Sequence, residues 1–349
     1  MNDLTVALAL FGGVVLAGVL AHGAWQARKA GPRRAAEAPR AEPTAAIEPV
    51  LDEPTDAGAA VDAGPAPIDA RPPRRVHPRL DALIDALAPL TIDAPVSGDL
   101  VVAHLPPSRR AGSKPFFVEG LNEASGEWEP PAPGQRYREF QAGVQLANRS
   151  GALNEIEYSE FVQKVQAFAD GVGASADFPD MLDVVARARE LDGFAGGHDA
   201  QVAVHLRARS TAWSPGYIQQ HASRHGFVPG AVPGRLVLPS ADEGAPPMLT
   251  LTFDPQAALA DDPNQAALRD VTLSFDVPQT DPKAEPFAAW QASAQALSLG
   301  MDAAIVDDNG APLSAAGFEQ IGGQLGQLYE ALAARDLAAG SPAARRLFS

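Results

Sequence analysis

The sequence predicts an N-terminal membrane-spanning helix, a disordered linker and then an α+β part made of two similar units in tandem. Three observations lead to this prediction. Residues 4–21 form an apolar run without a charge. Residues 30–75 are mostly Ala, Pro, Arg and acidic residues without a hydrophobic period. From residue 78 onward, strand-like alternation and helical spacing of apolar residues return, which is typical of a folded α+β chain.

The apolar run is long enough to cross a bilayer. At a rise of about 1.5 Å per residue it spans a hydrocarbon core of roughly 30 Å, so we expect the helix over residues 4–24. A cleaved signal peptide would carry positive charge before the run, but residues 1–3 carry none. The positive charges follow it, beside an interfacial aromatic residue, and this flank comprises Trp25, Arg28, Lys29, Arg33 and Arg34. The positive-inside rule therefore predicts a single-pass protein with residues 1–3 in the periplasm and the rest in the cytoplasm.

The predicted linker covers residues 25–77, basic at first and then rich in proline, alanine and acidic residues. It offers too little apolar surface to offset the entropy lost on ordering, so we expect it to be disordered. Its basic start is either a stop-transfer signal or a contact with anionic lipid. A flexible chain of about 45 residues averages roughly 40 Å end to end, which keeps the folded part near the membrane.

Composition excludes several classes of protein. The 349 residues include no cysteine, which rules out disulfides, thiolate metal sites and thiol nucleophiles. A formal net charge of −16 argues against nucleic-acid binding, which needs a basic face. The sequence contains no nucleophile-elbow motif and suggests no cofactor. We therefore expect a protein that binds a partner and is not an enzyme, with an enzyme of unknown type as the weaker alternative.

Two motifs have spacings that suggest metal ligands, but both are incomplete. His221 and His225 lie at i and i+4 of a predicted helix, yet Ala222 replaces the glutamate of the zinc-protease pattern. Residues 307–310 read Asp-Asp-Asn-Gly and lack the alternating ligands of a calcium loop, so a turn is the better interpretation. We expect no metal site.

A basic loop in the first unit is a candidate anion site. Arg109, Arg110 and Lys114 flank Gly112, so positive charge gathers around a flexible turn. The strand–glycine–helix context of a phosphate-binding loop is absent, so the pattern matches neither a P-loop nor a dinucleotide turn.

The second unit, expected over residues 197–337, has the element order β-α-β-β-β-α-α. Residues 202–207 alternate, with Val202, Val204 and Leu206 on one face. A helix opens at Ser214-Pro215 and ends at Gly226. Further strands are expected over residues 235–238, 248–253 and 271–277, and helices follow from Pro286 and from the cap Ser314.

The first unit, expected over residues 78–196, has the same order. Strands are expected near residues 83–92, 115–121, 128 and 140–148, and helices after Ser97 and over residues 158–172 and 179–191. A constant offset of 129 places Val144 and Leu146 on Leu273 and Phe275, and residues 166–171 on 295–300. Chance similarity of two alternating strands is the alternative, but we interpret the match as a duplicated unit. Residues 338–349 are left as a C-terminal tail.

Several of these segments resemble the ZipA family of cell-division proteins. The similar segments are residues 22–29, Val271–Pro278, Phe287–Leu297, Ile305–Asp308 and the cap Ser314. The resemblance covers residues 1–34 and 200–335. It implies split β-α-β units with an antiparallel sheet, one face of which holds the C-terminal tail of the tubulin-like protein FtsZ. It also implies a tether that anchors or stabilises the Z-ring at the inner membrane of the division site.

The resemblance implies a binding groove at Val202, Val204, Val232, Thr272 and Ser274. Thr272 and Ser274 are small and polar where family members have bulky apolar residues. Three explanations stay open: a shallower groove, an alignment shifted by one residue, or a contribution from the first unit. Val202 and Val204 also fit a simple core role. Other possibilities are an adaptor for a different envelope or division partner, or a periplasmic protein.

Overall fold

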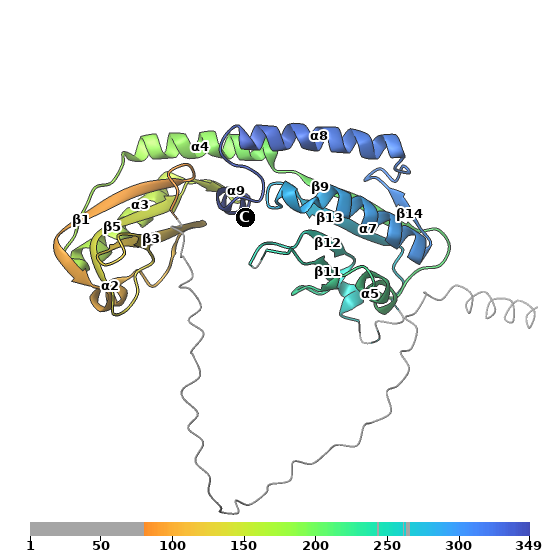
Figure 1. Cartoon of the computed structure of the whole chain (residues 1–349), viewed down its shortest axis with the longest axis horizontal. Helices are drawn as coiled ribbons and strands as arrows, with labels where there is room; N and C mark the ends of the chain where they lie inside the picture. The colour runs from red at the N-terminus through yellow and green to blue at the C-terminus, as the bar shows by residue number, and fades with distance from the viewer. Residues whose placement is uncertain (1–79, 243, 261, 263–265) are drawn as a thin grey trace, which may run out of the picture.

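The computed structural model describes residues 80–349 except residues 243, 261 and 263–265. The predicted membrane helix, its flank from Trp25 to Arg34 and the linker lie outside the described residues. In the part that is described, no helix has the length and apolar character needed to cross a membrane. This part is α+β with two main antiparallel sheets, as the sequence predicts (Figure 1).

The first sheet has the strand order β2-β3-β5-β1-β8, and β4 also pairs with β3. Its strands are β1 (Asp85–Ser97), β2 (Arg110–Ala111), β3 (Lys114–Asn122), β4 (Trp128–Glu129), β5 (Arg136–Gln145) and β8 (Ser175–Ala176). The helices of this half are α2 (Gly98–His104), α3 (Glu155–Val172) and α4 (Met181–His198). A small hairpin, β6 (Ala147–Asn148) and β7 (Gly151–Ala152), connects β5 to α3.

The second sheet has the strand order β10-β11-β12-β13-β9-β14. Its strands are β9 (Gln201–Ala208), β10 (Val228–Pro229), β11 (Arg235–Leu238), β12 (Leu249–Thr252), β13 (Asp270–Asp276) and β14 (Ala303–Val306). The helices are α5 (Pro215–Ser223), α6 (Pro255–Ala258), the 3-10 turn η1 (Pro282–Ala284), α7 (Pro286–Met301), α8 (Ala315–Ala333) and α9 (Pro342–Leu347).

The two sheets share a strand order. The order β3-β5-β1-β8 in the first corresponds to β12-β13-β9-β14 in the second. The C-caps of α3 and α7, Gly173 and Asp302, are both left-handed, with φ of 72° and 56°, and lie at the offset seen in the sequence. The buried residues of the two helices follow the same offset: Phe161, Val165, Phe168 and Val172 in α3, and Trp290, Ala294, Leu297 and Met301 in α7.

Local sequence explains where the helices begin. Ser97, Ser214 and Ser314 each accept a hydrogen bond from a backbone N–H in the first turn of α2, α5 and α8. At α3, Asn154 and Glu157 form a reciprocal capping box. Such caps satisfy N–H groups that the helix leaves unpaired, and each typically stabilises a helix by about 1 kcal/mol.

Each sheet packs one face against its helices. In the first half, the rings of Phe140 in β5 and Phe168 in α3 meet edge to face with centroids 5.7 Å apart. In the second half, Trp290 of α7 contacts Phe275 of β13, and its Nε1 donates to the Leu273 carbonyl at 3.0 Å. These aromatic residues anchor two separate cores.

The C-terminal segment leaves the second half and returns to the first. Phe318 and Leu325 of α8 belong to the second core, but Leu332 at the end of the same helix belongs to the first. Residues 338–349, predicted to be a C-terminal tail, instead include α9, whose Ala344 and Leu347 are buried in the first core. Figure 1 shows α4 and α8 along the same outer side, with the C-terminus between the two halves.

Candidate functional site

Two of the predicted groove residues lie in the second core. Val204 of β9 is 1% exposed and pairs with Leu273, while Val202 is half-buried and pairs with Phe275. Paired residues on neighbouring strands share a face, so both valines face α7. Of the two roles that the sequence allowed for these valines, groove or core, the structure places them in the core.

Two others lie on the opposite face of the same sheet. Thr272 pairs with His205 and Ser274 pairs with Ala203, so these side chains point away from α7. Ser274 is 3% exposed and accepts a hydrogen bond from the Gln201 side chain. The structure therefore does not bring the predicted pairs Val202–Val204 and Thr272–Ser274 together on one face.

On that face, a cluster of polar and charged side chains lies over β13 and β9 and reaches the residues that follow β14. The Nδ1 atom of His205 lies 3.2 Å from Asp270 and also 3.2 Å from the Thr272 hydroxyl. Its Nε2 atom lies 3.0 Å from Asp308, and Arg207 reaches the second oxygen of Asp270 at 3.3 Å. The hydroxyl of Thr272 is thus part of a polar network, which suits an apolar ligand poorly.

Val232 lies apart from the other four, in the turn between β10 and β11. It is 52% exposed and lines a pocket of about 290 Å³ with residues from α5, β10, β11 and α6 and with Phe253, which follows β12. Two more exposed apolar residues lie in the same region, Val228 at 44% and Leu259 at 69%. We call this feature the Val232 pocket; its walls include Pro215, Pro229, Pro233, Leu236, Phe253 and Ala258.

The turn that carries Val232 is held close to the sheet. Gly234 has a φ of 74°, and a Cβ atom at this position would lie 2.6 Å from the Phe253 carbonyl oxygen. Only glycine fits both the conformation and the space. The backbone of the Val232 pocket is therefore fixed by contact with the residues that follow β12.

The predicted anion loop around Gly112 already holds two carboxylates of this chain. The Gly112 N–H donates to Glu160 at 2.9 Å, and the Ser113 N–H donates to Glu157 at 2.7 Å. Both acids come from the first turns of α3, and the Lys164 side chain also binds Glu160, at 2.6 Å. The carboxylates attach the β2–β3 turn to the helix.

The three basic residues of that loop have different surroundings. Lys114 is fully buried, and its Nζ donates to Asn148 Oδ1 at 2.7 Å and to the Gly151 carbonyl at 2.6 Å. Burial lowers the pKa of its ammonium group below the ordinary value. Arg110 donates to the Ser113 carbonyl at 2.6 Å. Arg109 instead lines a separate pocket beside β3.

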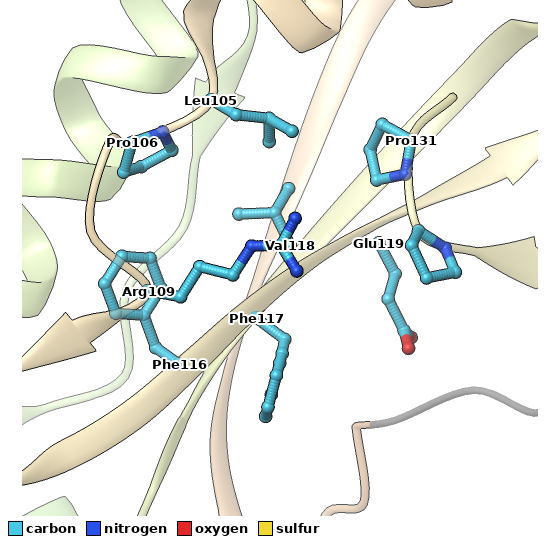
Figure 2. Close-up of a pocket in the computed structure, with 9 residues that line it drawn as sticks. Leu105, Pro106, Arg109, Phe116, Phe117, Val118, Glu119 and Pro131 are labelled. Atoms are coloured by element: carbon cyan, nitrogen blue, oxygen red, sulfur yellow. The ribbon is translucent and has the colours of Figure 1, made fainter. Parts of the chain in front are cut away.

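Figure 2 shows this second pocket, which we call the β3-edge pocket. Its volume is about 30 Å³, close to the share of one water molecule in the liquid. Its walls come from the α2–β2 loop, from β3 and from the β4–β5 loop, and the residues are Leu105, Pro106, Arg109, Phe116, Phe117, Val118, Glu119, Pro130 and Pro131. The lining is apolar apart from one guanidinium and one carboxylate.

A larger cavity, of about 880 Å³, lies where the C-terminal segment meets the first sheet. Asp85, 1% exposed, forms two hydrogen bonds with Arg346 of α9 nearby, at 2.6 and 2.8 Å. Burial raises the pKa of Asp85 even though Arg346 acts in the opposite direction. This pair is a structural junction between the C-terminal helix and β1.

Among the described residues, no three His, Cys, Asp or Glu side chains are grouped so that they could hold a metal ion. His221 and Asp307, considered as ligands from the sequence, belong to no such group there.

Comparison of the chain with protein-family models and with curated proteins finds no match. The function must therefore be inferred from the sequence resemblance and from the geometry of the Val232 pocket and the β3-edge pocket.

Proposed function

We propose that this chain is a membrane-tethered adaptor of cell division that binds the C-terminal tail of FtsZ. In this role the N-terminal helix lies in the inner membrane, and the folded part holds the Z-ring close to it. The resemblance to the ZipA family over the anchor and the second unit supports this proposal. The proposed activity is binding alone, with no catalytic step.

The single observation that carries the binding role is the Val232 pocket. Exposed apolar residues that gather beside a pocket are typical of docking sites for partner proteins. Val232 lines the pocket, and the exposed Val228 and Leu259 are the chain neighbours of its wall residues Pro229 and Ala258, whereas Val202 and Val204 face the core. We therefore place the FtsZ tail at the outer end of the second sheet, with its apolar side chains in the pocket.

The matching strand orders support a further part of the proposal, that the two halves are duplicated split β-α-β units. In both, the strand that precedes the long helix pairs with the first strand, and the short strand after that helix pairs with the first strand on its other side. The first unit would then be a copy that kept the fold and changed its surface.

Weak binding by one chain is enough for such a tether. Many anchored chains would face many FtsZ tails along a filament, so the effective affinity rises through avidity. A different envelope or division protein as the partner is the alternative, since the same anchor and adaptor would serve it.

The test is binding of a fluorescent FtsZ tail peptide to the full-length chain in lipid nanodiscs, followed by fluorescence anisotropy. We expect saturable micromolar binding, weakened about tenfold or more by Val232→Glu, because a buried charge in the pocket is costly. Leu299→Glu is the matched control, since Leu299 is 86% exposed on α7. If both variants weaken binding equally, or if neither does, the tail binds at a site other than the Val232 pocket. Absence of binding by the folded chain would remove FtsZ as the partner.

A further inference from the structure

The outer edge of β3 has a gap one residue long at Val118. On the β2 side of the gap, the Phe116 N–H donates to the Arg109 carbonyl at 3.0 Å. On the β4 side, Gly120 pairs with Glu129. Backbone groups alternate between the two sides of a strand, so Val118 directs its N–H and C=O outward, as Phe116 and Gly120 do. In the described part of the chain, no backbone group bonds to Val118 on that side.

Prolines keep this gap open. Pro106 approaches it from the α2–β2 loop, and Pro130 and Pro131 approach it from the β4–β5 loop. A proline has no backbone N–H, so neither loop can donate a hydrogen bond to the Val118 carbonyl from these positions. The result is an apolar notch with one donor and one acceptor at its base.

A guanidinium lies at the same notch. The Arg109 side chain lines the pocket with Val118 and extends over β3, as Figure 2 shows. Arg109 is exposed, and among the described residues its guanidinium has no hydrogen bond or ion pair. The nearby Glu119 points away from it, and Glu119 accepts a hydrogen bond from Gln141 at 3.0 Å. Arg109 is therefore placed to receive an anion from outside.

We propose that the β3-edge pocket binds the free C-terminus of a partner polypeptide with a small apolar last residue. The terminal carboxylate pairs with Arg109, for which a guanidinium has the fitting bidentate geometry. The backbone of the last residues hydrogen-bonds with Val118, and the terminal side chain lies between Pro106 and Pro131. This mode combines strand addition with capture of a carboxylate.

The closed ends of the gap favour a chain terminus over a continuous strand. A long strand running along the edge would collide with β2 on one side and β4 on the other, because both already pair with β3. A chain end needs only the single free position. The small volume of the pocket limits a fully enclosed terminal side chain to about the size of the alanine methyl group.

This site is independent of the FtsZ proposal, since it lies on the first sheet and shares no lining residue with the Val232 pocket. Binding at each site can therefore be measured separately from binding at the other. Val232→Glu is expected to leave the β3-edge pocket unchanged.

The experiment compares fluorescein-labelled hexapeptides with either a free carboxylate or an amide at the C-terminus. The sequence Gly-Ser-Gly-Ser-Ala-Xaa is used with Ala, Val or Leu at the last position, and binding to the full-length chain in nanodiscs is followed by anisotropy. We expect at least one acid to bind about tenfold more tightly than its amide, because only the acid pairs with the guanidinium.

Two variants distinguish this site from other surfaces. Arg109→Met is expected to reduce acid binding to the level of the amide, while Arg138→Met, at an exposed arginine of β5, leaves it unchanged. Val118→Pro removes the outward N–H and is expected to weaken acid and amide alike. Equal binding of acid and amide, or no acid binding at about millimolar peptide by a chain with native circular dichroism, would overturn the proposal.

Discussion

The half-buried Arg346 in the last helix forms a bidentate ion pair with the buried Asp85 at the start of β1, with N–O distances of 2.6 and 2.8 Å. The Arg346 guanidinium also lies over the Phe117 ring, 5.3 Å from its centroid. Gln145 Nε2 donates to the carbonyl of Arg346 at 2.7 Å. One residue, through its side chain and its carbonyl group, thus connects the C-terminal helix to three strands of the first sheet.

Arg346→Met should destabilise the whole fold. It leaves the Asp85 carboxylate buried without its partner, and loss of one member of a buried pair costs about 3–5 kcal/mol. The free energy of unfolding in urea, followed by tryptophan fluorescence, measures the loss. The double variant Asp85→Leu with Arg346→Met should be more stable than Arg346→Met alone. A double variant as unstable as the sum of the singles would show that the two side chains act independently.

The effect of Arg346→Met should depend on pH in a defined direction. The folded pKa of Asp85 is raised above its ordinary value of 3.8, and removal of Arg346 raises it further. A raised carboxyl pKa means that the folded state binds more protons, so stability falls as pH rises through that interval. We therefore expect the difference between wild type and variant to be small below the Asp85 pKa and to grow above it. A difference that stays constant with pH would contradict this account.

Tyr329→Phe should stabilise the protein. Tyr329 in α8 packs against both cores, and within the described structure its buried hydroxyl has no hydrogen-bonding partner. Burial raises the pKa of this hydroxyl to about 12. Removal of an unsatisfied buried hydroxyl typically gains about 1 kcal/mol or more. The melting temperature checks the sign, and Tyr137→Phe is the contrasting variant, because the Tyr137 hydroxyl donates to Glu129 and accepts from the Ala132 N–H. We expect that second variant to be less stable.

Local signals in the sequence predicted most elements of the fold. The caps Ser97, Ser214 and Ser314 begin α2, α5 and α8 as expected, and the alternation over residues 202–207 and 271–277 matches β9 and β13. These features depend on residues close in sequence, where propensity and periodicity decide the structure.

The groove residues could not be placed in the same way, because a shared face depends on register between strands. Val204 pairs with Leu273, so Thr272 and Ser274 fall on the other side. A one-residue difference in register would reverse this relationship, and the periodicity of a single strand does not contain it.

Long-range contacts were the other part that local patterns missed. Asp85 precedes the apolar residues 86–90 of β1, and its partner Arg346 lies 261 positions away. Lys114 is similar, since its burial depends on the β6–β7 hairpin. A charged residue next to an apolar stretch was a usable signal that a buried partner exists, but nothing nearby in the sequence identified which residue it is.

The proposed membrane orientation predicts the result of reporter fusions made after His77. We expect green fluorescent protein at this point to fluoresce and alkaline phosphatase to stay inactive, because the positive-inside rule keeps the basic flank in the cytoplasm. Replacement of Arg28, Lys29, Arg33 and Arg34 by glutamine should weaken or reverse this pattern. Replacement of Arg74 and Arg75 should not, since charges far from the apolar run contribute little. An active phosphatase on the unmodified sequence would place the folded part in the periplasm, where FtsZ is absent, and would exclude the proposed tether.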